Sequence, residues 1–225
     1  MYFLFLAPAL LLSLWASMKV KSNFKKYSRI STSRGMTGAE AAAAILRREG
    51  INDVKIAPTR GMLSDHYNPI SKTLALSEEV YSSRSIAAVG VAAHEVGHAI
   101  QHAKGYAPLW VRSLLVPTAN IGSSVGYIMM FLGLIIASQG LVLLGAVLFS
   151  MVFLFQLVTL PVEFNASSRA KTILVDQGLV KKKKKKGVDK VLNAAAMTYV
   201  AAAVSTLMTL LYFLLRAGLL GGRGD

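Results

Sequence analysis

The amino-acid sequence predicts a mainly α-helical membrane protein with about four spans and a small α+β domain after the first span. The chain of 225 residues is 54% hydrophobic, which is well above the share that is usual for a soluble globular protein. Several of its uncharged stretches are long enough to cross a bilayer. Its 25 Lys and Arg outnumber its 11 Asp and Glu and are concentrated between those stretches, as in a membrane protein with cationic loops.

Three uncharged stretches account for the four predicted spans. Residues 1–18 predict transmembrane helix 1, and because the positive charges follow this stretch, an uncleaved anchor with its amino terminus outside is favoured over a signal peptide. Residues 113–162 contain fifty residues without a charged side chain, which predicts a hairpin of two spans with its turn at 138–140. The uncharged run 191–215 predicts the fourth span, placed at 191–217, with a buried soluble helix as the alternative.

The distribution of positive charge predicts the orientation in the membrane. With the amino terminus outside, fourteen Lys and Arg in 19–112 and nine in 163–190 lie inside, whereas only Arg216 and Arg223 lie outside. These loop charges need no nucleic acid to explain them. Residues 181–186 are six lysines without the interleaved aromatic side chains that single-strand binding uses, so we expect a solvated, disordered loop that could attract anionic lipids.

The segment 19–112 is long enough to form a small domain. A helix is expected from Thr37 or Gly38 to Arg48, followed by short strands at 54–57 and 73–76, with turns between them that include 65–69. A longer helix then begins at 83–85 and ends near Lys104. Its many Ala and Gly residues make it thin, so other elements can approach it closely.

Two histidines on this longer helix form a candidate metal site. His94 and His98 are four residues apart, which places both imidazoles on one face. The chain has no cysteine, so histidine and carboxylate must supply the metal ligands. Glu95 is predicted to take a proton from a metal-activated water and to pass it to the leaving amine. The H-E-x-x-H pattern is typical of zinc metallopeptidases and arises by chance in on the order of one per cent of chains of this length.

A catalytic zinc ion needs a third protein ligand, and the sequence offers two candidates. His102 lies eight residues after His94, which is about 12 Å of helix rise, so one ion cannot easily reach both. Glu163 ends the long uncharged stretch, and a hairpin of two spans returns it to the side of the membrane that holds His98. We therefore predict Glu163 as the third ligand, with an ordinary interfacial charge as the alternative.

Stretches that cover most of the chain carry a resemblance to a known family. They are residues 65–69 (DHYNP), 71–81, 83–88, 94–101 (HEVGHAIQ), 160–167 (LPVEFNAS) and 191–201. In combination they resemble the YugP-type neutral zinc metallopeptidases, a family of bacterial membrane proteins.

The resemblance implies a zincin-like catalytic domain over 19–112, with gluzincin-like zinc ligation by His94, His98 and Glu163 and with Glu95 as the base. It also implies protein or peptide substrates and a multi-pass location in the bacterial inner membrane, with the active site facing the cytoplasm. The family usually has Asp where this chain has Asn68 and Asn165, and the second departure argues against a supporting carboxylate at position 165.

Several further residues are candidates for supporting roles. Arg169 follows Glu163 by six residues and could orient it or stabilise an oxyanion, although a plain positive charge explains it equally well. His66 is a second candidate for the oxyanion, with Tyr67 as its rival. The strand at 73–76 could pair with an extended substrate by edge addition.

Zinc-dependent proteolysis is the activity that the sequence favours, and membrane-protein quality control is a role that would suit it. The alternative is a catalytically silent zinc-binding membrane scaffold, against which the intact Glu95 argues. A transporter is disfavoured, because the uncharged runs 113–162 and 191–215 lack the ionisable side chains that such proteins place within their spans. A homo-oligomer is compatible with the sequence.

Overall fold

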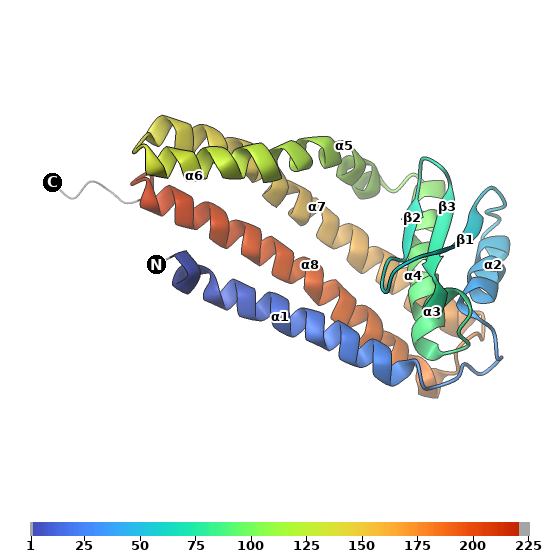
Figure 1. Cartoon of the computed structure of the whole chain (residues 1–225). Helices are drawn as coiled ribbons and strands as arrows, with labels where there is room; N and C mark the ends of the chain where they lie inside the picture. The colour runs from blue at the N-terminus through green and yellow to red at the C-terminus, as the bar shows by residue number, and fades with distance from the viewer. Residues whose placement is uncertain (1, 221–225) are drawn as a thin grey trace. The chain divides into compact units, whose positions relative to one another are not determined.

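The computed structural model describes residues 2–220 and confirms the mainly α-helical class (Figure 1). Within this range, four helical segments are long and apolar enough to cross a membrane, namely Leu4–Tyr27, Ala107–Ile135, Gln139–Asp176 and Lys182–Arg216. Met1 of the predicted first span and Arg223 of the predicted outer side lie outside the described residues. The chain divides into two compact units. The first contains residues up to 16, 110–161 and those from 198 on, and the second contains 17–109 and 162–197.

The first unit is built from parts of the long apolar helices. It contains the start of α1 (Tyr2–Tyr27), most of α5 (Ala107–Ile121), a π-helical turn (Gly122–Gly126), α6 (Tyr127–Ile135), the first part of α7 (Gln139–Asp176) and the end of α8 (Lys182–Arg216). Met130, Val142, Phe149 and Phe213 belong to its buried core. Many other large apolar side chains of these helices are exposed, as expected for surfaces that face lipid.

The turn of the predicted hairpin lies two residues earlier than the expected 138–140. α6 ends at Ile135 and α7 already begins at Gln139, so the turn is formed by residues 136–138. Ala137 adopts a left-handed conformation with φ 53°, and the Ser138 hydroxyl accepts a hydrogen bond from the Leu141 amide. This capping bond starts the helix at a position that the apolar pattern alone did not mark.

The second unit combines helices with a three-stranded sheet. Its strands are β1 (Lys55–Thr59), β2 (His66–Asn68) and β3 (Thr73–Ser77), in the order β1-β3-β2, with β1 parallel and β2 antiparallel to β3 (Figure 1). The sheet is accompanied by α2 (Gly38–Arg48), α3 (Glu78–Tyr81) and α4 (Ile86–Ala103). The expected helices and the two expected strands are all present, with small shifts at their ends.

Strand β2 lies where the sequence predicted only a turn. Asp65 accepts hydrogen bonds from the backbone amide and the hydroxyl of Ser77, which tie the start of β2 to the end of β3. The Asn68 side chain accepts from the amides of Ile70 and Ser71 and closes the connection to β3. Because Thr73–Ala75 now pair on both sides, the prediction that this strand offers a free edge to a substrate was wrong for those residues.

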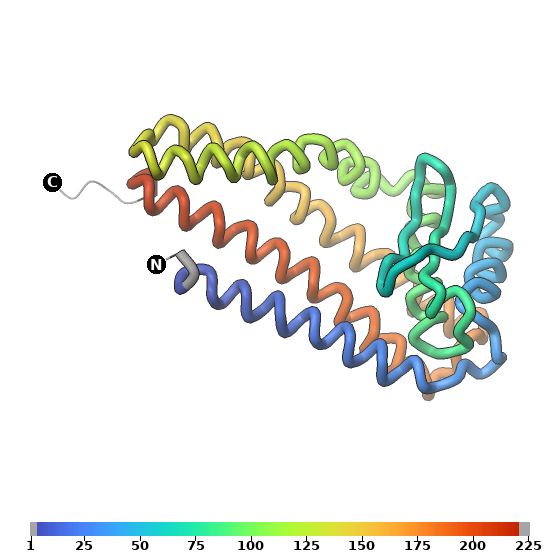
Figure 2. The backbone as a smooth tube through the Cα atoms, in the orientation of Figure 1, coloured from blue at the N-terminus to red at the C-terminus, as the bar shows by residue number. Residues whose placement is uncertain are grey.

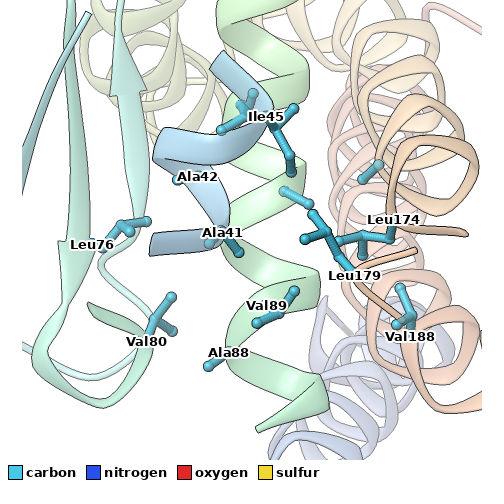
Figure 3. Packing of buried hydrophobic residues seen from close by; sticks show 14 of the residues in the cluster. Ala41, Ala42, Ile45, Leu76, Val80, Ala88, Val89, Leu174, Leu179 and Val188 are labelled. Atoms are coloured by element: carbon cyan, nitrogen blue, oxygen red, sulfur yellow. The ribbon is translucent and has the colours of Figure 1, made fainter. Parts of the chain in front are cut away.

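The core of the second unit surrounds α4. Figure 3 shows Ile45 of α2 and Val89 of α4 among the buried side chains of this core, with Leu174 and Leu179 to the right of α4. Fully burying each large aliphatic side chain of this kind is worth about 1.5–3 kcal/mol. Thr37 caps α2 through a reciprocal pair of hydrogen bonds with Glu40, which explains why this short helix starts at Gly38 as predicted.

The run of lysines is helical, which corrects the expectation of a disordered loop. α8 begins at Lys182, since lysine is a good helix former and two of the side chains find local partners. Lys184 donates to the carbonyl of Ser31, and Lys185 pairs with Asp189 one turn later. The start of α8 lies beside the end of α1, where the Asn23 side chain donates to the carbonyl of Lys190 (Figure 2).

Candidate metal centre

The helix that carries the two histidines is α4, and it is capped at both ends. The Ser85 hydroxyl accepts a hydrogen bond from the Ala88 amide at its start, and Gly105, with φ 62°, follows its end. His94 and His98 extend from the same side of α4, with ring centroids 4.8 Å apart in an edge-on arrangement. The helical period therefore places the two imidazoles as predicted.

Glu163 of α7 meets both imidazoles. Its Oε2 lies 3.1 Å from His94 Nε2 and 3.6 Å from His98 Nε2, and one ligand atom from each of the three residues lies within 4.8 Å of the others. Donor atoms around a tetrahedral zinc ion, with bonds of about 2.0–2.2 Å, are separated by about 3.3–3.6 Å. The three predicted ligands therefore converge in an arrangement whose chemistry and spacing suit zinc.

The other nitrogen of each imidazole has a hydrogen-bonding partner. Ser167 Oγ lies 3.1 Å from His94 Nδ1, and Gln101 Oε1 lies 3.0 Å from His98 Nδ1. The amide oxygen of Gln101 can only accept, so His98 Nδ1 carries a proton and donates it to Gln101, while Nε2 faces Glu163. Partners of this kind fix the tautomer and the ring orientation of a metal-binding histidine.

Gln101 connects α4 to α7 and is fully buried, with an exposed fraction of 0%. Its Nε2 donates to the carbonyl of Val162 at 2.9 Å and to Asn165 Oδ1 at 3.0 Å. All the polar atoms of this side chain are thus engaged, and one of its partners is the residue that immediately precedes Glu163. No pattern in the sequence predicts a role for Gln101 or Ser167. The i+4 spacing from Glu163 to Ser167 was the only signal that could have found the serine.

A glycine inside the H-E-x-x-H motif allows α7 to come close. A Cβ atom on Gly97 would lie 2.8 Å from the carbonyl oxygen of Ala166 and 3.1 Å from its Cα, closer than side chains tolerate. Ala166 and Ala170 of α7 are themselves fully buried. Small residues on both helices therefore permit the approach that brings Glu163 to the histidines.

The charges around His98 favour its protonated form. Burial alone would lower the pKa of this imidazole, but the hydrogen bond to Glu163 and the negative charges of Glu95 and Glu163 outweigh it and hold the pKa above its ordinary value. A metal ion that binds His98 therefore has to displace a proton more often than at an ordinary histidine.

Comparison with known proteins shows the family to which the chain belongs. The protein family described as "Putative neutral zinc metallopeptidase" matches residues 2–218. The chain belongs to this zinc metallopeptidase family. It is similar to the "Putative membrane protease YugP" of Bacillus subtilis (strain 168), with 51% identity over 216 residues that cover 96% of each chain. No solved structure matches it.

Membership of the zinc metallopeptidase family implies zinc as the metal, and His94, His98 and Glu163 could hold it. Glu95 is buried on α4, and its charge acts on the neighbouring His98. Arg169 Nε donates to Asn165 Oδ1 at 2.7 Å, the same atom that accepts from the buried glutamine. The amide oxygen of Asn165 thus accepts from two side chains, those of Gln101 and Arg169.

The remaining candidates lie on and around β2. His66 is exposed, and its Nδ1 lies 2.8 Å from the carbonyl oxygen of Ser64. The Tyr67 hydroxyl lies 2.8 Å from His102 Nδ1. Within residues 2–220, His102 does not belong to the cluster of metal-binding side chains, which agrees with the distance argument from the helix rise.

Proposed function

We propose that this protein is a membrane-embedded zinc metallopeptidase that hydrolyses peptide bonds with Glu95 as its general base. The convergence of His94, His98 and Glu163 is the observation that carries the proposal. Zinc, held by these three residues, would supply a Lewis acid that activates water at neutral pH.

The chain's own residues would perform the proton transfers and hold the geometry. Glu95 accepts a proton as the water oxygen bonds to the peptide carbonyl carbon, and it returns that proton to the amine nitrogen as the carbon–nitrogen bond breaks. Gln101 and Ser167 form hydrogen bonds with the Nδ1 atoms of His98 and His94, so the Nε2 atoms of the two imidazoles stay directed at Glu163. The second proton of the water also ends on this nitrogen, so the products are a carboxylate and a protonated amine.

The oxyanion that forms at the peptide carbonyl needs a donor, and two residues are proposed. Arg169 is held by Asn165 through its Nε, which leaves the rest of the guanidinium free to reach an anion. His66 engages Nδ1 with a backbone carbonyl, so its Nε2 would have to be protonated to act as a donor. Tyr67 is bound to His102 and is the weaker rival.

We place the active site at the cytoplasmic face of the bacterial inner membrane. Of the 25 Lys and Arg, all but Arg112, Arg216 and Arg223 fall in the second unit, together with the candidate metal ligands. This asymmetry supports a cytoplasmic second unit and spans at 1–18, 113–162 and 191–217. A role in membrane-protein quality control and an attraction of anionic lipids to residues 181–186 belong to the same proposal.

The test is the variant Glu95→Gln in the purified full-length protein. It is expected to keep one zinc per chain, measured by elemental analysis, and to lose peptide cleavage by at least about 10²-fold, as for removal of a general base. Glu78→Gln, at the exposed start of α3, is the matched control and should cleave normally.

Undiminished cleavage by Glu95→Gln would refute the assignment of the base. A zinc-loaded wild-type protein that cleaves no member of a broad peptide library would instead support the catalytically silent scaffold.

A further inference from the structure

A pocket with a volume of about 580 Å³ lies beside the end of α1, and the metal site does not use it. All the residues that line it belong to the second unit. They include three cationic side chains and three apolar ones, namely Lys21, Lys25, Arg29, Phe24, Met62 and Leu63. The pocket therefore combines a basic part with an apolar part.

The charge of the pocket favours an anion. Lys21 and Lys25 are four residues apart on α1 and share one face, and Arg29 lies two residues beyond the end of this helix. Within the described part of the chain, no ion pair neutralises these three cations. Glu79 is the one carboxylate among the lining residues, so the lining keeps a net positive charge of two.

The apolar part is supplied by an ordered loop between β1 and β2. Met62 and Leu63 stand at its tip with exposed fractions of 61% and 39%. Leu63 adopts a left-handed conformation with φ 57°, which is rare for a bulky residue, and the Ser64 hydroxyl holds the loop by donating to the carbonyls of Arg60 and Gly61. The loop thus keeps two adjacent apolar side chains at the pocket instead of burying them.

The position along α1 places the pocket at the level of lipid headgroups. The span Leu4–Tyr27 begins seventeen residues before Lys21, which corresponds to about 26 Å of helix rise. The hydrocarbon core of a bilayer is about 30 Å thick, so Lys21, Lys25 and Arg29 fall where the apolar interior gives way to phosphate.

We propose that this pocket binds the headgroup of an anionic phospholipid. Its phosphate contacts Lys21, Lys25 and Arg29, while its glycerol and upper acyl carbons contact Phe24, Met62 and Leu63. An acidic peptide would satisfy the cations but would leave the exposed apolar pair without a role. The proposal rests on the membrane location of the chain and not on its proposed peptidase activity.

The test measures binding of a fluorescent phosphatidylglycerol to the full-length protein in zwitterionic detergent, with phosphatidylcholine as the reference lipid. Removing both charges in Lys25→Gln/Arg29→Gln is expected to weaken binding by about 30-fold, since each cation near a lipid surface is worth about 1 kcal/mol. The matched control, Arg47→Gln/Arg48→Gln, removes two exposed cations of α2 and should bind as wild type does. All these positions are exposed, so the variants are expected to fold, which thermal unfolding verifies.

A second pair of measurements distinguishes the lipid from other anions. Met62→Ser/Leu63→Ser should also weaken phosphatidylglycerol binding several-fold, and millimolar inorganic phosphate or an acidic peptide should not displace the lipid. Equal binding of phosphatidylcholine, equal losses in the α2 control, or displacement by phosphate or peptide would overturn the proposal. Glu163→Ala, which disables the metal site, should leave lipid binding unchanged, so the two proposals can fail separately.

Discussion

Replacement of Gln101 by methionine is expected to weaken zinc binding without touching a proposed zinc ligand. The two side chains have similar length and volume, so the substitution leaves little empty space in the core. It removes the acceptor for His98 Nδ1 and both donors that reach α7, at Val162 and Asn165. No water can take their place readily, because Gln101 is fully buried.

The size of the effect follows from which partners lose their hydrogen bonds. Asn165 Oδ1 keeps the bond from Arg169, whereas the His98 N–H loses the partner observed here. A buried donor without a partner costs about 1–3 kcal/mol, which corresponds to roughly 5-fold to 150-fold in an equilibrium constant. This range agrees with the 10–100-fold loss of metal affinity that is typical when such an outer partner is removed.

The assay is a competition for zinc between the purified protein and a chromophoric chelator, together with thermal unfolding in the presence and absence of zinc. The variant should show a 10–100-fold weaker zinc affinity and a smaller zinc-induced rise in Tm. Gln177→Met, which follows the end of α7 in the same unit, is the matched control and should bind zinc normally. Wild-type zinc affinity in a folded Gln101→Met protein would refute the view that this side chain orients His98.

Three further predictions concern close packing, a buried carboxylate and the metal ion. Gly97→Ala should destabilise the second unit by about 1–3 kcal/mol and reduce zinc content, because its Cβ would lie 2.8 Å from the Ala166 carbonyl oxygen. Gly90→Ala on the same helix, whose Cβ would meet its nearest neighbour at 3.5 Å, should be tolerated, and equal losses in both variants would contradict the packing argument. Burial raises the pKa of Asp65 above its ordinary value, although the hydrogen bonds from Ser77 oppose this shift. The folded protein therefore binds a proton at Asp65 more tightly than the unfolded chain does. The stability that this proton contributes is present at low pH and is lost as pH rises through the raised pKa. The Tm of Asp65→Asn relative to wild type should therefore increase with pH above the ordinary range of an aspartate, and a constant difference between pH 4 and 8 would exclude this explanation. Chelation of the metal should lower the Tm of the wild-type protein and added zinc should restore it, whereas an unchanged Tm would argue against a metal that binds only the folded chain.

Local patterns in the sequence determined the elements whose signal lies within one segment. The apolar runs gave the four long helices, because a span needs only length and the absence of charge. His94 and His98 follow from the helical period, which depends on no other part of the chain. The prediction of Glu163 as the third ligand needed one further argument, since it depended on the number of membrane crossings between this residue and the histidines.

Only the tertiary structure showed how α4 and α7 meet. Gln101 and Ser167 have ordinary surroundings in the sequence, and their roles depend on which groups of the other helix they face. Strand β2 likewise could not be predicted from the sequence, because three residues are too few to show a periodic pattern. Its pairing with β3 also depends on the contact between Asp65 and Ser77, which are twelve residues apart. Such contacts depend on packing between distant segments, whereas periodicity and length are properties of one segment alone.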